Sequence, residues 1–355
     1  MTLRVATIGS GLIARMAHVP GYQKAGAEVV ATVDIVEARA KKLAEDFHIE
    51  SAYTNYHDML ARSDIDAVSI CVPNHLHKEI TIAALKAGKH VLCEKPMATT
   101  VDEAKAMLDA SKESDKILMI GFNNRFRSDV QRLKKFIDRG QLGDIYYAKA
   151  GYVRRRGTPF GWFTVKQESG GGPVIDIGVH AIDLTRYLMG NPRPVTVMAS
   201  TYKKFGHYDL MDTTAWCSSD VIDGLRTGEE FDVEDLAAAL IRFDNGATMT
   251  VDVSWAANLE KRDNLYASLY GDKAGAQLSP DLTIFGEQDG MLTDSKVNTV
   301  NKNTHEEEIK HFLSCIEKGE TLISTPQHGL EIQQILNAIY DSARTGKSVD
   351  LPLLQ

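Results

Sequence analysis

The chain has 355 residues, of which 43% are hydrophobic and 25% charged, and its formal net charge is −8. This length suffices for two domains, and an acidic charge without a basic block gives no reason to expect a nucleic-acid partner. No apolar run approaches the ~18 residues that a membrane-spanning helix needs. The first residues lead into a strand without a signal-peptide pattern, and the four cysteines lie far apart, so we expect free thiols and a cytoplasmic location.

Residues 1–122 alternate short β-rich runs with helical patterns such as "VEARAKKLAEDF" and "VDEAKAMLDASKES". The predicted strands cover Arg4–Ile8, Glu28–Asp34, Ala67–Val72, His90–Cys93 and Ile117–Phe122. Their nearly continuous apolar character indicates a parallel sheet covered on both faces, which predicts a doubly wound α/β domain of the Rossmann type. Ligands of such sheets bind at the carboxyl ends of the strands.

The first strand runs into "IGSGLIARMAH", a G-x-G-x-x-A pattern that opens a helix. Gly9 permits a tight turn, Gly11 lets a pyrophosphate approach the backbone, and the small Ala14 allows close helix–strand packing. The helix N-terminus attracts the phosphate charge. We therefore predict a dinucleotide site in which Leu12 and Ile13 also contact the cofactor.

Asp34 ends the second predicted strand about 20 residues beyond this loop. A carboxylate here can accept hydrogen bonds from an adenosine ribose and repels a 2′-phosphate, which favours NAD over NADP. Nearby Arg39 keeps some use of NADP open. The alternative role for Asp34 is a helix cap, because Asp34–Glu37 also fits a capping pattern, and the two roles can coexist.

The next strand ends in "CVPNHLHKE", at the edge where a nicotinamide half would lie. We expect Cys71, Pro73, Asn74 and His77 to line the cofactor site, with Asn74 binding a ribose or capping the following helix. His75 and His77 form an H-x-H pair that could suggest a metal. Metal sites favour tighter and more explicit ligand sets, so we expect none here and interpret His77 as part of the loop wall.

The strand after that delivers Glu94, Lys95 and Pro96 to the same edge in "HVLCEKPMATT". A charged pair followed by proline can simply mark the end of a strand. The sharper interpretation is that Lys95 is a reacting group, because a desolvated lysine beside a cationic nicotinamide ring would have a lowered pKa.

The pattern changes after residue 122. Strand-like runs such as "PVTVMASTY" and "NLYASLYGDKAGAQL" follow one another, and Asp244-Asn245-Gly246 predicts a hairpin. We predict an α+β domain over residues 123–355 with a large, mainly antiparallel open sheet, which ends in two amphipathic helices. An open sheet face is often a subunit interface, so we expect a homo-oligomer, a dimer or tetramer.

A second polar cluster lies in "SGGGPVIDIGVHAIDL". Asp176 and His180 are four residues apart and share one face of a helix, and Asp183 lies near that face. The glycines at 170–172 give the backbone room near a ligand. Oxidation of an alcohol needs a base for the hydroxyl proton, and histidine suits this role when a carboxylate orients it. The alternative for His180 is a purely structural histidine.

Together "GSGLIA", "VPNHLH", "EKPM", "SGGGPVIDIGVHAIDL", "YGDKAG" and the tail from "HFLSCIEKGE" to "TGKSV" resemble the Gfo/Idh/MocA family of dehydrogenases over essentially the whole chain. The resemblance implies that Lys95, Asp176 and His180 form the catalytic group. It also implies NAD or NADP in the first domain and a sugar, polyol or derivative before the second domain's sheet. Cofactor-side positions further include Glu94 and Asn123.

One departure from the family pattern concerns the cofactor contact before the glycine run. Many relatives carry Trp-Arg there, whereas this chain has Trp162-Phe163, so Trp162 remains a cofactor-side candidate without the arginine. Arg154 and Lys166 are candidates for substrate contact at the pocket entrance. The alternative for Arg154 is a solvated or ion-paired surface arginine.

The resulting hypothesis is an NAD(P)-dependent dehydrogenase that oxidises a secondary alcohol of a sugar or cyclitol. One alternative is an NAD-dependent glycosidase or epimerase-type enzyme, in which oxidation is transient and no net redox change appears. Another is a cofactor-binding regulatory protein without chemistry. The presence of Lys95, Asp176 and His180 together argues against a regulatory protein without chemistry.

Overall fold

The computed structural model describes residues 2–206, 230–260 and 263–352. Two compact units make up the chain: Met1–Phe126 with Lys302–Gln333, and Arg127–Asn301 with Gln334–Gln355. The sequence places the boundary at residue 122 and assigns the whole C-terminal tail to the second domain, so the unit assignment of Lys302–Gln333 differs from that expectation. Within the described residues, every helix is too short or too polar to cross a membrane.

The first unit contains a six-stranded sheet with the order β3-β2-β1-β4-β5-β6, and all of its pairings are parallel. Its strands are β1 (Arg4–Ile8), β2 (Glu28–Val33), β3 (Ser51–Tyr53), β4 (Ala67–Ile70), β5 (His90–Glu94) and β6 (Leu118–Gly121). The strand order reverses between β1 and β4, which is where ligands bind in doubly wound sheets. This confirms the predicted Rossmann fold.

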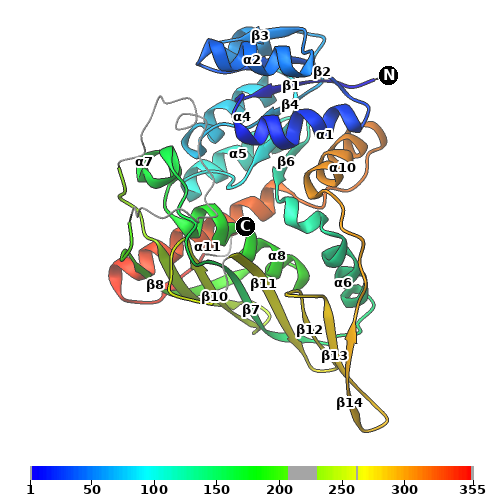
Figure 1. Ribbon diagram of the computed structural model, residues 1–355, viewed down its shortest axis with the longest axis vertical. Coiled ribbons are helices and arrows are strands. Elements are labelled where there is room, and N and C mark those ends of the chain that lie inside the picture. The colour runs from blue at the N-terminus through cyan, green and yellow to red at the C-terminus, as the bar shows by residue number, and fades with distance from the viewer. Residues whose placement is uncertain (1, 207–229, 261–262, 353–355) are drawn as a thin grey trace. The chain divides into compact units, whose positions relative to one another are not determined.

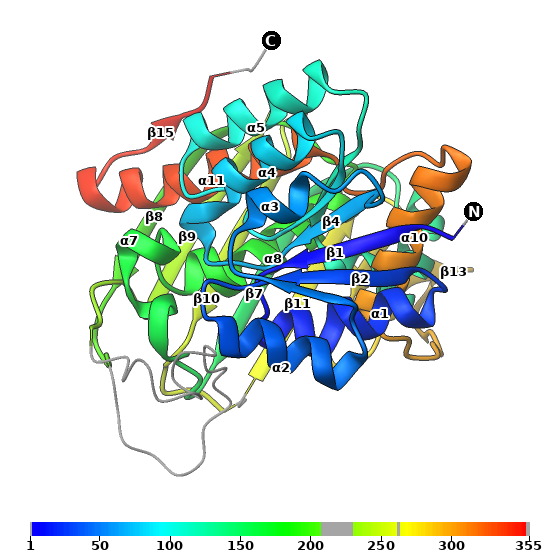
Figure 2. The same ribbon diagram turned by 90° about the horizontal axis from the view of Figure 1, so that it is seen from above.

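Helices cover both faces of this sheet, and Figure 2 shows α1 and α2 on one side of the strands and α4 and α5 on the other. The helical segments of the unit are the π-helical turn η1 (Ala14–His18), α1 (Val19–Lys24), α2 (Glu37–Phe47), α3 (Tyr56–Leu60), η2 (Asn74–Leu76), α4 (His77–Lys86), α5 (Val101–Glu113), η3 (Asn123–Phe126) and α10 (Thr304–Lys318). Thr100 caps α5 by accepting a hydrogen bond from the backbone of Glu103.

The packing of α10 explains why residues 302–333 belong to the first unit. Ile309 and Phe312 on this helix are fully buried in the same hydrophobic cluster as Val5 of β1. α10 lies beside α1 (Figure 1), and a Cβ on Gly21 would come within 2.5 Å of Ile309 Cδ1. Glycine at this position leaves room for the Ile309 side chain between the two helices.

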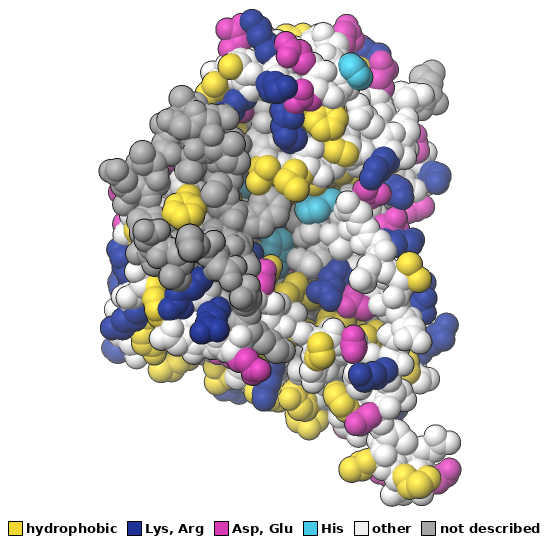
Figure 3. Space-filling model, in the orientation of Figure 1, with side chains coloured by type: hydrophobic (Ala, Val, Ile, Leu, Met, Phe, Trp, Pro, Cys, Tyr) yellow, Lys and Arg dark blue, Asp and Glu magenta, His cyan; other side chains and the backbone are white. Residues whose placement is uncertain are grey.

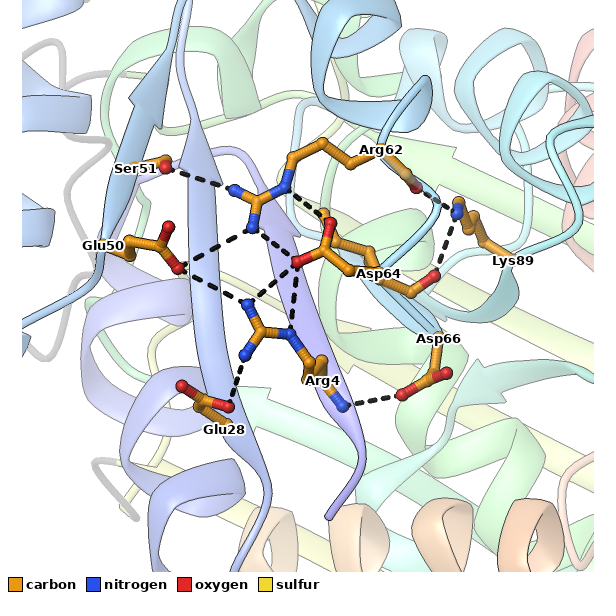
Figure 4. A network of polar contacts seen from close by, with 9 residues as sticks. Arg4, Glu28, Glu50, Ser51, Arg62, Asp64, Asp66 and Lys89 are labelled. Atoms are coloured by element: carbon orange, nitrogen blue, oxygen red, sulfur yellow. Dashed lines mark hydrogen bonds and ion pairs between the residues drawn. The ribbon is translucent and has the colours of Figure 1, made fainter. Parts of the chain in front are cut away.

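The amino ends of the parallel strands are joined by a network of ion pairs (Figure 4). Arg4 and Arg62 share the carboxylates of Asp64 and Glu50, and Arg4 also pairs with Glu28 at 2.8 Å. Charged groups of several strand starts thus satisfy one another at this edge, while the polar site residues lie at the carboxyl edge.

The second unit is built on a nine-stranded sheet with the order β14-β13-β12-β11-β7-β10-β9-β8-β15. β10 pairs with β7 in parallel and the other pairings are antiparallel, which confirms the predicted mainly antiparallel sheet. The strands are β7 (Ile145–Arg154), β8 (Pro194–Tyr202), β9 (Leu236–Phe243), β10 (Thr248–Ser254), β11 (Asp263–Gly271), β12 (Gly275–Gln277), β13 (Thr283–Gln288), β14 (Met291–Lys296) and β15 (Val349–Asp350).

The helices of this unit include α8, which packs against β7 and β11. The helical segments are α6 (Ser128–Asp138), η4 (Gly161–Thr164), α7 (Lys166–Ser169), the π-helical turn η5 (Val174–Gly178) and α8 (Val179–Leu188). Helix α11 (Pro326–Thr345) is divided between the units after Gln333. The predicted hairpin is present between β9 and β10, with Gly246 at φ +86°.

Candidate functional site

The glycine loop packs against the carboxyl end of β4. Gly9 adopts φ +96°, and a Cβ at this position would lie 2.2 Å from the carbonyl oxygen of Cys71. Only glycine allows both the backbone angle and the close approach. The loop then continues into η1, as the sequence predicts, so a helical N-terminus follows Gly11.

Asp34 lies directly beside this loop, after β2. Its Oδ2 accepts a hydrogen bond from the backbone N–H of Ser10 at 3.0 Å, and its Oδ1 accepts one from Val36 at 2.9 Å. Arg39 Nη1 approaches Asp34 Oδ1 at 4.0 Å. The carboxylate therefore caps the turn before α2 and at the same time holds a negative charge next to the glycine loop. Both roles anticipated for Asp34 are geometrically compatible, and this arrangement fits the ribose end of a dinucleotide.

His77 joins the ends of two neighbouring strands. It is fully buried, with Nδ1 2.8 Å from the carbonyl oxygen of Pro96 and Nε2 3.0 Å from that of Val72. Burial lowers the pKa of His77, although the two carbonyl oxygens oppose this effect. His77 thus connects the loop after β4 to the segment that carries Lys95, as a loop-wall residue does. Among the described residues, no group of three or more His, Cys, Asp or Glu side chains is arranged to hold a metal ion.

Glu94 is the last residue of β5 and points into the interior. Its Oε1 lies 2.8 Å from His18 Nε2, and its Oε2 accepts a hydrogen bond from the backbone N–H of Lys95 at 3.2 Å. Burial alone would raise the pKa of Glu94, but the hydrogen bond and charge of His18 outweigh burial and hold it below its ordinary value. Glu94 is therefore an ionised carboxylate that fixes the backbone from which Lys95 projects.

The other candidates of this unit lie close to the same edge. Pro73 precedes η2, and Asn74, its first residue, is buried. Asn123 follows β6, and its Nδ2 is 3.0 Å from Thr304 Oγ1 and 3.1 Å from His305 Nε2. Asn123 therefore contacts α10.

In the second unit, Asp176 and His180 differ from all their neighbours in exposure. Every other residue from 171 to 189 is buried, whereas these two are partly accessible. Asp176 lies in η5 and His180 in the first turn of α8, so a π-helical turn rather than a regular helix separates them. Asp176 Oδ2 accepts a hydrogen bond from Nε1 of the fully buried Trp255 at 3.0 Å.

The glycine run before Asp176 makes room for protein side chains. A Cβ on Gly171 would lie 2.0 Å from the Tyr340 hydroxyl, and one on Gly172 would lie 2.2 Å from the carbonyl oxygen of Glu234. The buried Glu234 carboxylate accepts hydrogen bonds from the N–H groups of Gly172 and Val174, at 3.1 and 3.2 Å, and from the Tyr340 hydroxyl at 2.8 Å. Burial raises the pKa of Glu234, against the effect of these hydrogen bonds.

Arg154 is buried rather than solvated. Its guanidinium lies over the Tyr152 ring at 5.0 Å, and its Nε is 3.5 Å from Asp263 Oδ1. Burial lowers the pKa of Arg154, but Tyr152, Asp176 and Asp263 together raise it above its ordinary value. Arg154 therefore acts electrostatically on Asp176.

The last two candidates, Trp162 and Lys166, lie in the short helical segments η4 and α7 before the glycine run. Lys166 begins α7, and its Nζ lies 6.0 Å from the centre of the Tyr340 ring. Trp162 stacks on Phe163 with ring centres 4.0 Å apart. Phe163, which stands where many relatives have arginine, packs against the cluster of Ile177, Val233 and Trp255.

Two family models match the chain, one in its N-terminal part and one in its C-terminal part. Residues 3–122 match the family model described as "Oxidoreductase family, NAD-binding Rossmann fold", and residues 130–277 match the GFO/IDH/MocA C-terminal domain. The chain belongs to the Gfo/Idh/MocA oxidoreductase family. This membership confirms the resemblance inferred from the sequence and identifies the chain as an enzyme of the oxidoreductase class.

Two curated members of the Gfo/Idh/MocA family match the chain over most of its length. D-glucoside 3-dehydrogenase of Escherichia coli (strain K12) is 36% identical over 98% of this chain and 97% of that protein. Levoglucosan dehydrogenase of Pseudarthrobacter phenanthrenivorans is 31% identical over 88% of this chain and 87% of that protein. A structure of levoglucosan dehydrogenase in complex with NADH superposes with a TM-score of 0.87 at 26% identity and covers all of both chains.

Several residues of the site could not be predicted from the sequence. His18, Trp255, Glu234 and Tyr340 contact Glu94, Asp176 or the glycine run from positions distant in the sequence. None of them belongs to a local motif, so spacing carries no signal for them. His18 does lie in the quoted stretch "IGSGLIARMAH", four residues after the G-x-G-x-x-A pattern, but that pattern gives it no role.

Proposed function

We propose that this oxidoreductase removes hydride from a secondary alcohol of a sugar with NAD as acceptor. The observation that carries the proposal is the selective exposure of Asp176 and His180, two polar side chains left accessible in a segment that is otherwise buried. A carboxylate and an imidazole in this arrangement suit the transfer of a hydroxyl proton. The two full-length relatives named as sugar dehydrogenases support the same chemistry.

The cofactor site is proposed at the carboxyl edge of the Rossmann sheet. Gly9, Gly11, Leu12 and Ile13 would bind the pyrophosphate, and Asp34 would bind the adenosine ribose. The nicotinamide half would lie against the loops after β4, β5 and β6, which contain the remaining candidates Cys71, Pro73, Asn74, His77, Glu94, Lys95 and Asn123. Trp162 is proposed to add a cofactor contact from the second unit. The bound nicotinamide would supply the hydride acceptor.

The reacting hydroxyl is proposed to contact Lys95 and His180 together. As the carbon–hydrogen bond breaks and hydride leaves, the oxygen–hydrogen bond also breaks and its electron pair forms the carbonyl. His180 takes the released proton, while Asp176 orients the imidazole from the position fixed by Trp255. Lys95 donates a hydrogen bond to the reacting oxygen and stabilises its developing charge. Arg154 and Lys166 are proposed to contact other substrate hydroxyls.

Asp34 supports NAD as the preferred dinucleotide. Its carboxylate lies within hydrogen-bond distance of the glycine-loop backbone, so a 2′-phosphate would meet a negative charge there. Arg39, at 4.0 Å from that carboxylate, is engaged with Asp34 rather than turned away from it. A relative named as an NADP-dependent D-xylose 1-dehydrogenase, from Haloferax volcanii, is 26% identical, so the family model alone leaves the choice of dinucleotide open.

The proposed substrate is a pyranose whose anomeric carbon is blocked. D-glucosides and levoglucosan, named for the two curated relatives, are acetals at that carbon and therefore cannot be oxidised there to a lactone. Oxidation is proposed at a ring secondary alcohol such as the 3-hydroxyl. Free thiols at Cys71, Cys93 and Cys315 support the cytoplasm as the compartment; Cys217 lies outside the described residues.

The test is a panel of methyl glucosides, levoglucosan, free aldoses and cyclitols, each with NAD and with NADP, followed by absorbance of the reduced nicotinamide. We expect accumulation of NADH with the acetals and a keto sugar as product. Lys95→Ala should lower kcat by at least about a hundred-fold while the dissociation constant of NADH changes little. Wild-type turnover in that variant would contradict the assigned role of Lys95.

We also infer that the chain forms a homo-oligomer through the open face of its large sheet. Met198 of β8 and Leu240 of β9 are directly paired across the strands and remain 52% and 42% exposed. Exposed apolar side chains that gather on one face of a sheet mark an interaction surface. A second copy of the chain is the proposed occupant.

A further inference from the structure

Four ionisable side chains gather inside the first unit next to the backbone of Lys95. Glu94 ends β5, His18 ends η1, and His305 and Glu308 lie one turn apart on α10. His18 and Glu308 are fully buried, Glu94 is buried, and the His305 side chain is 24% exposed. Two carboxylates and two imidazoles in the interior of a small sheet domain are costly unless they stabilise one another.

The first half of this cluster is fully hydrogen-bonded. His18 Nε2 lies 2.8 Å from Glu94 Oε1, and its Nδ1 lies 2.9 Å from Ser69 Oγ. Tyr22 closes the chain with its hydroxyl 2.7 Å from the same Ser69 oxygen. Every polar group here has a partner, so this half is rigid.

The second half is different. His305 Nδ1 faces Glu308 Oε2 at 3.6 Å, too long for a hydrogen bond. Neither Glu308 oxygen nor His305 Nδ1 has a hydrogen-bond partner among the described residues. A buried carboxylate normally has such partners, and leaving it without them costs stability. The His305–Glu308 pair is therefore held by the attraction between its charges rather than by a short hydrogen bond.

The two halves lie next to each other, with the ring centres of His18 and His305 6.4 Å apart, and their charges act on each other. Burial raises the pKa of Glu308, while His305 opposes that shift; Glu308 in turn raises the pKa of His305 against its burial. His305 and Lys95 both contribute to the low pKa of Glu94. The titratable groups that interact electrostatically with His305 or Glu308 are Glu94 and Lys95 at the end of β5, His18 and Tyr22 in the first helical segments, and Cys71 after β4.

We propose that His305 and Glu308 are positioning residues of the hydride-transfer site and that they set the charge beside Lys95 through Glu94. This inference rests on the proposed function, in which Lys95 binds the reacting oxygen. Neither residue is assigned a contact with substrate. They act through Glu94, whose carboxylate accepts the hydrogen bond from the Lys95 backbone.

The proton on His305 is the variable element of this arrangement. Asn123 Nδ2 lies 3.1 Å from His305 Nε2, so a neutral imidazole accepts there and carries its hydrogen on Nδ1, toward Glu308. When His305 gains one proton, that proton enters at Nε2, and the Asn123 amide must present its oxygen instead. The charge state of His305 is thereby coupled to the orientation of a side chain at the proposed cofactor edge.

The test compares the full-length protein with Glu308→Gln, which keeps the shape and removes the carboxylate. Imidazole NMR with ¹³C-labelled histidine, assigned with His305→Gln, follows the titration of His305. Its midpoint should lie above the ordinary pH 6.5 in the wild type and shift downward in Glu308→Gln, because the Glu308 charge then no longer opposes the effect of burial. The midpoint in the pH profile of kcat should shift in the same direction, with KM for the sugar changed less than about two-fold.

A matched control is Glu307→Gln, on the same helix, whose carboxylate pairs with Lys302 and Lys310 at the surface. It should leave both midpoints unchanged. The inference is overturned if the His305 midpoint shifts in Glu308→Gln while the kcat profile stays at the wild-type position, or if the His305 midpoint does not shift. If the wild type oxidises none of the sugars, the proposed function is wrong on that result alone. The further inference is then tested by the pH dependence of NADH binding, followed by fluorescence, whose midpoint must shift in Glu308→Gln.

Discussion

At the scale of single residues, the site depends on side chains that hold other side chains in place. Trp255 holds Asp176, His18 holds Glu94, and His77 connects the loop after β4 to the segment that carries Lys95. The motif residues themselves could be predicted from the sequence, because each follows directly after a strand or sits in a short pattern. Their supporting partners could not, because a contact between residues 18 and 94 depends on the strand order, which no local pattern contains.

Asp34 provides the sharpest residue-scale prediction about the cofactor. Replacing Asp34 with Ser removes the charge that a 2′-phosphate would meet but keeps a hydroxyl that can accept from Val36. We expect the ratio of kcat/KM for NADP to kcat/KM for NAD to rise by at least about ten-fold, or about 1.4 kcal/mol. Asp34→Asn, which is isosteric and uncharged, should shift the ratio in the same direction. An unchanged ratio in both variants would show that Asp34 only caps the turn.

Trp255 gives a second residue-scale prediction. The indole is fully buried, so it is not exposed to substrate, and its N–H donates a hydrogen bond to Asp176. Trp255→Phe removes this hydrogen bond and no substrate contact. We expect kcat to fall roughly ten-fold and KM for the sugar to change much less. The control is the double variant with Asp176→Asn: if Trp255 acts through Asp176, the two effects are not additive. Additive effects would assign Trp255 a separate structural role.

At the scale of elements, the sequence predicts the strands of the Rossmann sheet well where they are apolar and continuous. β1 has the predicted bounds, and the predicted strand near residue 67 is shortened to Ala67–Ile70 because the chain turns toward η2. β3, Ser51–Tyr53, is a three-residue edge strand without a buried residue, so no apolar run indicates it. Likewise, hydrophobic periodicity could not distinguish the π-helical turn η5 from an α-helix, because nearly every residue of η5 is buried.

The glycine run before η5 yields an element-scale prediction. In Gly172→Ala the new Cβ meets the backbone carbonyl of Glu234 at 2.2 Å, and backbone atoms cannot move aside as a flexible side chain can. The segment that carries Asp176 must then shift, so we expect a lower Tm and a fall in kcat of roughly a hundred-fold. Gly286→Ala in β13 is the control, because its Cβ would find only Thr293 Oγ1 at 3.4 Å. Wild-type kcat in Gly172→Ala would show that the position of this segment does not limit the reaction.

At the scale of the whole molecule, the described tail of the chain, residues 302–352, contributes to both units. Residues 302–333 complete the core of the first unit through α10, while 334–352 belong to the second. The sequence shows two amphipathic helices here but not which sheet each one covers, because an apolar stripe fits any apolar surface. Residues 1–126 alone therefore lack part of the hydrophobic core of the first unit, which α10 supplies.

The open face of the large sheet carries the prediction for the assembled protein. Hydrophobic side chains gather along the lower margin of Figure 3, over the strands of the second unit. Met198 of β8 and Leu240 of β9 are exposed apolar side chains of this sheet. Arginine at both positions would place two charges in an interface that a second copy must dehydrate. We expect the double variant Met198→Arg/Leu240→Arg to elute as a monomer in size-exclusion chromatography with light scattering, whereas the wild type elutes as an oligomer. Val300→Arg, at a position already 75% exposed, should leave the wild-type mass unchanged. An oligomer that persists in the double variant would place the subunit interface on another surface.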